Sequence, residues 1–240
     1  KHGGYVDAFA AKGAPEGSSL VYSTYLGGSH SDQCFDIAVD SAGSAVLVGL
    51  TSSPNFPVKS AFQKSIGGGA GDGFIAKLTP KGDGLLYSSF MGGSGSDALY
   101  DVALGGDGAA YVTGNTSGTF PIRNPFQIKR KGQMDGVVAK IASNGRSVVF
   151  SSYLGGGGQE TGYGIAVDES GAAYVVGQTT SVNFPLKSPF RATPNGSAEA
   201  FLTIVDPSGA KLLYSTFLGG IYRDEGWGVV LGAEGAIYLS

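Results

Sequence analysis

The sequence predicts an all-β protein, a β-propeller built from four-stranded antiparallel blades. A unit of about 64 residues occurs four times, and each copy holds four short segments rich in Val, Ile, Tyr and Phe. Gly, Asp and Pro separate these segments, as expected for strands joined by turns. A radial array of such sheets is the propeller architecture.

One motif marks the repeat most clearly. It reads YSTYLGG at Tyr22, YSSFMGG at Tyr87, FSSYLGG at Phe150 and YSTFLGG at Tyr214. The copies are 65, 63 and 64 residues apart. Three further series keep the same step and begin, in their first copies, at Asp7, Phe35 and Ala45. No segment has a 3.6-residue apolar period over three turns, so we expect little helix.

Sixteen strands are expected, in an order that leaves one blade divided. The chain begins with the third and fourth strands of a unit and ends with a first and a second strand. Complete repeats span 29–93, 94–156 and 157–220, and 221–240 with 1–28 form the split blade of a single domain, 1–240. Pairing of the two halves would close a ring and hide the sheet edges. Two alternatives stay open, an excerpt of a longer propeller and a blade shared with a neighbouring subunit.

These residues resemble the bacterial SBBP-type β-propeller repeat. The resemblance rests on Tyr22–Gly28, Ile37–Gly43, Thr51–Pro57 and Phe62-Gln63, with counterparts at Phe120-Pro121, Phe126-Gln127, Phe184-Pro185 and Phe190. It covers essentially the whole chain. The family implies seven blades where this chain supplies four, no shared catalytic site, and a location in secreted or surface proteins.

The composition limits the classes of partner and the location that we expect for the protein. The net charge of −3 gives no attraction to nucleic acid or to an anionic membrane, and no apolar stretch approaches the ~18 residues of a membrane-spanning helix. Cys34 is the single cysteine, which excludes an internal disulfide. Low charge with abundant Gly, Ser and Thr favours an extracellular or cell-surface location.

Basic residues gather in the long connections between second and third strands. These connections span 51–71, 115–134 and 178–198 and contain no Asp or Glu. Their basic residues are Lys59, Lys64, Arg123, Lys129, Arg130, Lys131, Lys187 and Arg191. They predict a ligand-binding rim for an anionic glycan, a cell-wall polymer or a protein partner; alternatively, the charges keep long loops soluble.

Acidic residues follow each Gly-Gly pair, in the connections that lead into the first strands. They are Asp32, Asp36, Asp97, Asp101, Glu160 and Asp224. Because the first strand is innermost, these carboxylates are expected at the mouth of the central channel, where a cluster of oxygens would suit Ca²⁺. The alternative is that each carboxylate caps backbone N–H groups where one blade passes to the next.

The sequence of the fourth copy differs most from the other three, and it holds Tyr222, Arg223 and Trp227 close together. These three residues are candidates for a unique ligand site. Two glycosylation sequons begin at Asn115 and Asn195, both at the ends of long connections.

No G-x-S-x-G, H-E-x-x-H or C-x-x-C motif occurs, so we expect no catalytic residues and no required cofactor. The sequence favours a non-catalytic binding, adhesion or scaffold module whose partner is a glycan, a cell-surface protein or another copy of itself. Two alternatives remain: a polysaccharide-active enzyme that uses the carboxylates, and an extracellular filament subunit.

Overall fold

The structure is a computed structural model that describes residues 3–240. Three antiparallel sheets have four strands each. The first holds β3 (Asp32–Val39), β4 (Ala45–Thr51), β5 (Asp72–Leu78) and β6 (Leu85–Met91). The second holds β7 (Asp97–Leu104), β8 (Ala110–Thr116), β9 (Asp135–Ile141) and β10 (Val148–Leu154). The third holds β11 (Glu160–Val167), β12 (Ala173–Thr179), β13 (Glu199–Val205) and β14 (Leu212–Leu218).

Two hairpins flank the three sheets. They are β1 (Ala8–Gly13) with β2 (Leu20–Leu26), and β15 (Val229–Leu231) with β16 (Ile237–Leu239). The one helical turn within residues 3–240 is the 3₁₀ segment η1 (Ala233–Gly235), so no described helix has the length to cross a membrane. The predicted all-β repeat of four-stranded blades with split terminal sheets is confirmed.

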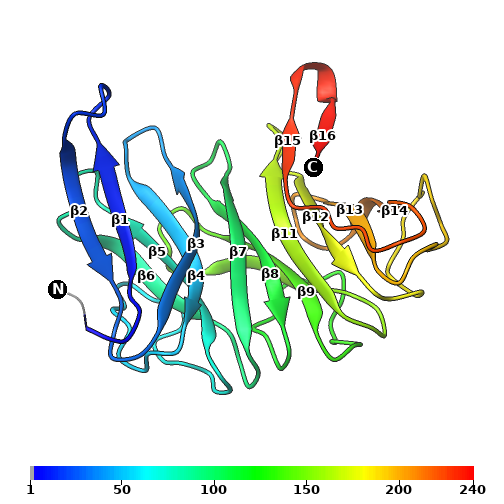
Figure 1. The fold of residues 1–240 in the computed structure, drawn as a ribbon, viewed down its shortest axis with the longest axis horizontal. Coiled ribbons are helices and arrows are strands. Elements are labelled where there is room, and N and C mark those ends of the chain that lie inside the picture. Colours follow the sequence, from blue (N-terminus) through cyan, green and yellow to red (C-terminus); the bar gives the residue numbers. More distant parts are fainter. Residues whose placement is uncertain (1–2) are drawn as a thin grey trace.

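The halves of the predicted split blade lie apart. The sheets follow one another in chain order, with the N-terminal hairpin at one end of the row and the C-terminal hairpin at the other (Figure 1). Within residues 3–240, no strand ladder joins the two hairpins. The pairing that would close a ring is therefore not made in this structure.

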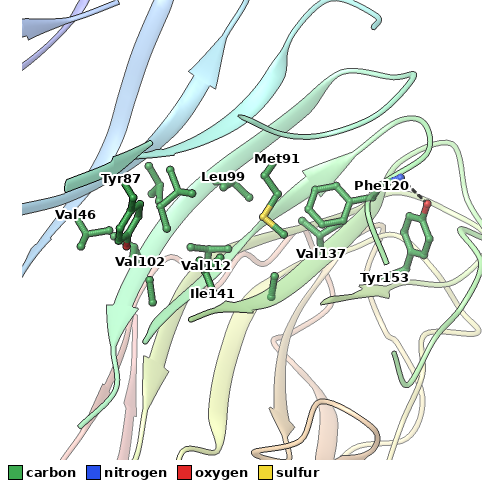
Figure 2. Packing of buried hydrophobic residues seen from close by; sticks show 14 residues of the cluster. Val46, Tyr87, Met91, Leu99, Val102, Val112, Phe120, Val137, Ile141 and Tyr153 are labelled. Atoms are coloured by element: carbon green, nitrogen blue, oxygen red, sulfur yellow. Dashed lines mark hydrogen bonds between the residues drawn. The ribbon is translucent and has the colours of Figure 1, made fainter. Parts of the chain in front are cut away.

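The hydrophobic core lies between neighbouring sheets. One cluster joins Val46 and Tyr87 of the first sheet to Val112 and Ile141 of the second, as Figure 2 shows. Comparable clusters join the second sheet to the third, and the N-terminal hairpin to the first sheet. Each sheet is thus stabilised by its neighbours, because burial of apolar surface between layers is the main favourable term in folding.

The long connections return along the outer edge of each blade. Lys59, Arg123 and Lys187 form isolated β-bridges to serines of the outermost strands β6, β10 and β14. Phe56 anchors the first connection, since it is buried with its ring 4.6 Å from that of Phe74. These contacts cover the edge strands, which would otherwise offer unpaired N–H and C=O groups.

Candidate functional site at the junction of the second and third blades

A β-bulge interrupts each innermost strand at the same repeat position. The register between β3 and β4 shifts between Cys34 and Asp36, which leaves Phe35 as the extra residue. Tyr100 in β7 and Tyr163 in β11 are extra residues in the same way. A bulge locally redirects side chains and terminates regular pairing, so three aromatic rings are turned out of the ladder.

The partner strand tolerates the bulge because it carries a glycine there. A Cβ at Gly114 in β8 would lie 1.8 Å from the carbonyl oxygen of Ala98, and one at Gly177 in β12 would lie 1.9 Å from that of Thr161. No side chain fits at such a distance. The glycine therefore allows the two backbones to approach and the bulge to form.

The redirected rings form a continuous row across successive blades. Ring centroids are 5.1 Å apart from Phe35 to Tyr100, 5.8 Å from Tyr100 to Tyr163 and 4.2 Å from Tyr163 to Trp227. Trp227 stacks on Tyr163 with 16° between the ring planes and is 60% exposed, and Phe35 is 39% exposed. We call these four residues the aromatic row.

A polar cleft of about 290 Å³ opens beside the middle of the aromatic row. Tyr100 and Tyr163 form part of its lining, together with Met134. Its other described lining residues are Asn115, Gln159, Thr161, Gln178, Thr180 and Arg223. The lining residues come from β7, β8, β11, β12 and the connections that precede β9, β11, β13 and β15, so the cleft lies where the second, third and fourth repeats meet.

Internal contacts hold the cleft in shape. The Nδ2 group of Asn115 donates to Oγ1 of Thr161 across the blade boundary, at 3.1 Å. Nη2 of Arg223 donates to Oε1 of Gln178 at 3.2 Å and forms an ion pair with Glu225 at 2.5 Å. Asn115 and Gln178 are only 8% and 9% exposed, so their side chains are fixed before any ligand arrives.

Asp36 and Asp101 each accept a hydrogen bond from the backbone of the next blade. The N–H of Val102 in β7 donates to Oδ2 of Asp36, at 3.0 Å, and the N–H of Ile165 in β11 donates to Oδ2 of Asp101, at 2.7 Å. Burial, followed by hydrogen bonding and charge repulsion from Asp36, raises the pKa of Asp101 to about 7. Asp101 therefore keeps its proton at mildly acidic pH, where an ordinary aspartate is ionised.

The remaining acids do not line the channel mouth as a metal cluster. Asp32, Asp97, Glu160 and Asp224 each accept a hydrogen bond from the N–H of a preceding glycine, at 2.7–2.8 Å. Asp32 and Glu160 also accept from Thr and Ser hydroxyls. They cap their own connections, as the second sequence interpretation expected. Within residues 3–240, no group of three His, Cys, Asp or Glu side chains is placed to hold a metal ion.

The predicted basic residues are spread over separate blades and do not gather in one rim. Lys59, Arg123 and Lys187 lie on the outer edges described above. Arg130 donates to backbone carbonyls of its own connection, and Arg191 forms an ion pair with the buried carboxylate of Glu199. Lys64, Lys129 and Lys131 are exposed. Of the basic residues predicted to bind a ligand, Arg223 is the one that the cleft lining includes.

Other sequence candidates are placed as follows. Asn115 lies within β8 and is buried, so its expected accessibility as a glycosylation acceptor was wrong, because the strand continues to Thr116. Asn195 is exposed in its connection. Tyr222 is 78% exposed and outside the cleft lining.

Burial, with a further contribution from the charge of Asp36, raises the pKa of Cys34 to about 11, which disfavours the reactive thiolate.

Sequence reasoning missed the amides of the cleft and most of the aromatic row. A signal was present in the alignment of the repeats. Phe35, Tyr100, Tyr163 and Trp227 occupy one repeat position, and Gln159 and Arg223 occupy another. The extra residue of the bulge, which breaks the two-residue alternation of a strand, prevented their side-chain directions from being inferred.

Comparison with known families agrees with the fold. A family model described as the SBBP beta-propeller repeat matches residues 21–57 and residues 149–185. The first match covers β2 to β4 and the second covers β10 to β12, so each includes the last strand of one blade and the first two strands of the next. The chain matches no curated protein.

Proposed function

We propose that this protein, which carries β-propeller repeats of the SBBP family, is a non-catalytic binding module of an extracellular or cell-surface protein. Its role is adhesion or scaffolding, and its ligand is a glycan held on the face where the aromatic row and the polar cleft lie. The observation that carries this proposal is the row of four aromatic rings beside fixed side-chain amides.

The aromatic row has the character of a recognition surface. Tyr and Trp are enriched at binding interfaces, where they supply a large apolar area at a small cost in side-chain entropy. Here a bulge in each of β3, β7 and β11 redirects one ring, and Trp227, which precedes β15, continues the row. A concave site with aromatic walls and a few fixed polar groups is the usual form of a ligand site.

The placement of the carboxylates supports a role without catalysis. Glycoside hydrolysis needs two carboxyl groups that reach the scissile bond from opposite sides. Asp97 is fully buried at the start of β7, and the described lining of the cleft contains no Asp, Glu, His or Cys. The alternative of a polysaccharide-active enzyme depends on residues such as Asp97 and Asp224, whose oxygens cap glycine N–H groups.

The test is a glycan and protein array probed with the intact protein, the Trp227→Ala variant and the matched Tyr222→Ala control. Both residues are exposed aromatics of the fourth repeat, but Trp227 alone belongs to the aromatic row. We expect a glycan ligand whose affinity falls about tenfold or more in Trp227→Ala and is unchanged in Tyr222→Ala. Equal affinity in all three proteins, or cleavage of the ligand detected by mass spectrometry, would contradict the proposal.

Assembly with copies of this chain is the second candidate role. The outer edges of β1 and β16 have no ladder partner within residues 3–240. In a complete blade the equivalent strands pair directly, as β12 pairs with β13. Phe9 and Tyr238 on these hairpins are 64% and 62% exposed, so apolar surface accompanies the free edges. Unpaired edges of this kind favour the addition of a strand from another chain.

A further inference from the structure

We infer that the polar cleft at the junction of the second and third blades binds one pyranose ring of an uncharged polysaccharide. This inference rests on the proposed function and deepens it, because it names the position and the chemical class of the ligand. Three properties of the cleft lead to it: its remaining hydrogen-bonding capacity, its charge and its aromatic wall.

The cleft offers donors and acceptors side by side. Oε1 of Gln178 is occupied by Arg223, which leaves the Nε2 group as a donor. Nδ2 of Asn115 is occupied by Thr161 and Met134, which leaves Oδ1 as an acceptor. The side-chain amide of Gln159 is exposed and hydrogen bonds to no other described residue. A sugar hydroxyl both donates and accepts, so it matches such mixed groups better than a phosphate, whose ionised oxygens only accept.

The charge of the lining favours an uncharged ligand. Arg223 is the one charged residue among the described residues of the lining, and its guanidinium is paired with Glu225 through both Nε and Nη2. A carboxylate that entered the cleft would lose water without gaining a free cation. Uronic acids are therefore disfavoured, in contrast to the anionic glycan that the distribution of Lys and Arg in the sequence suggested.

The aromatic wall supplies the apolar contact. Tyr100 and Tyr163 meet edge to face at 5.8 Å, and Trp227 extends the surface beyond Tyr163. The C–H face of a pyranose ring is apolar, while its hydroxyl groups project around the rim of the ring. Packing that face on the tyrosines would bury apolar area and direct the hydroxyls toward Gln159 and Gln178.

The experiment is calorimetric titration of the intact protein with galacto-, gluco-, manno- and xylo-oligosaccharides of four to six units, and with oligogalacturonate. Oligogalactose and oligogalacturonate form a pair that differs in the carboxylate. We expect at least one neutral series to bind, and the uronate to bind at least about tenfold more weakly than any neutral series that binds. Gln159→Ala should weaken neutral binding about tenfold, and Gln33→Ala, an exposed glutamine of the first blade, should not.

The outcomes separate this inference from the proposed function. If the array ligand is an anionic glycan, and Trp227→Ala weakens its binding, the inference about uncharged sugar fails while the proposed function stands. If neutral sugar binds equally to the intact protein, Gln159→Ala and Trp227→Ala, both fail. Tight oligogalacturonate binding that is lost in Gln159→Ala would also overturn the inference.

Discussion

Replacement of Gly145 by alanine is expected to lower the free energy of unfolding by about 3 kcal/mol. Gly145 lies in the turn between β9 and β10 with φ 68°, and its turn packs against the preceding blade. A Cβ there would lie 2.0 Å from the ring of Tyr87 in β6. Tyr87 is 2% exposed and belongs to the core between the first two sheets, so the ring has little room to move.

The matched control is Gly17→Ala in the equivalent turn of the N-terminal hairpin. Gly17 has φ 72° and makes the same turn hydrogen bond, to Ala14, that Gly145 makes to Ala142. No described atom lies within 4 Å of its would-be Cβ. We expect the free energy of unfolding of this variant to fall by about 1 kcal/mol, because only backbone strain at the positive φ acts there. Urea unfolding of both variants measures the difference; equal losses would mean that adjacent blades do not pack as the structure has them.

Replacement of Asp36 by asparagine is expected to stabilise the protein at pH 8 by on the order of 2 kcal/mol. The asparagine keeps an oxygen to accept from the N–H of Val102 and gains an amide that donates to the carboxylate of Asp101. It removes the carboxylate whose hydrogen bond and charge, after burial, do most to raise the pKa of Asp101. The other group facing the pair from β3 is the Cys34 thiol, and β11 contributes the N–H of Ile165.

The direction in which stability changes with pH follows from the direction of this pKa shift. Since the pKa of Asp101 is raised from its ordinary 3.8 to about 7 in the folded protein, the folded state binds more protons than the unfolded state between those values. Stability should therefore fall as the pH rises from about 4 to about 7. Asp36→Asn should reduce this fall. Part of it should persist, because burial also raises the pKa of Asp72, Asp97 and Glu160.

Urea unfolding at pH 5 and pH 8 measures this effect. The control is Glu169→Gln, which removes the same charge at an exposed position and should leave the pH dependence as in the unmodified protein. An Asp36→Asn protein that is less stable than the unmodified one at pH 8, with the same pH dependence, would contradict the effect of Asp36 on the pKa of Asp101.

Most of the fold followed from the sequence because repetition imposes one solution on every copy. Glycine and aspartate at fixed repeat positions located the turns, and the runs of Val, Ile and aromatic residues located the strands. The capping role of Asp32 and Glu160, one of two interpretations, also followed from their distance to the glycine pair. The pairing of the terminal hairpins did not follow, since no local pattern determines contacts between residues so far apart.

The candidate site could be predicted from the sequence only in part. Arg223 and Trp227 were selected because their repeat differs from the others, and both lie at the site. The basic residues were misjudged as a common rim because the sequence does not reveal that each connection returns along an outer edge. Gln159 and Gln178 were missed because a single amide has no characteristic spacing, and the cleft arises from the packing of two blades.

Fluorescence of Trp227 tests the central claim most directly, because it is the one tryptophan in the chain and stacks within the aromatic row. A ligand that lies on the row changes the surroundings of the indole. Titration with a ligand that calorimetry shows to bind should shift or quench the emission, with the same midpoint as the heat of binding. A saturating heat signal with unchanged tryptophan emission would place the ligand elsewhere on the molecule and contradict the account.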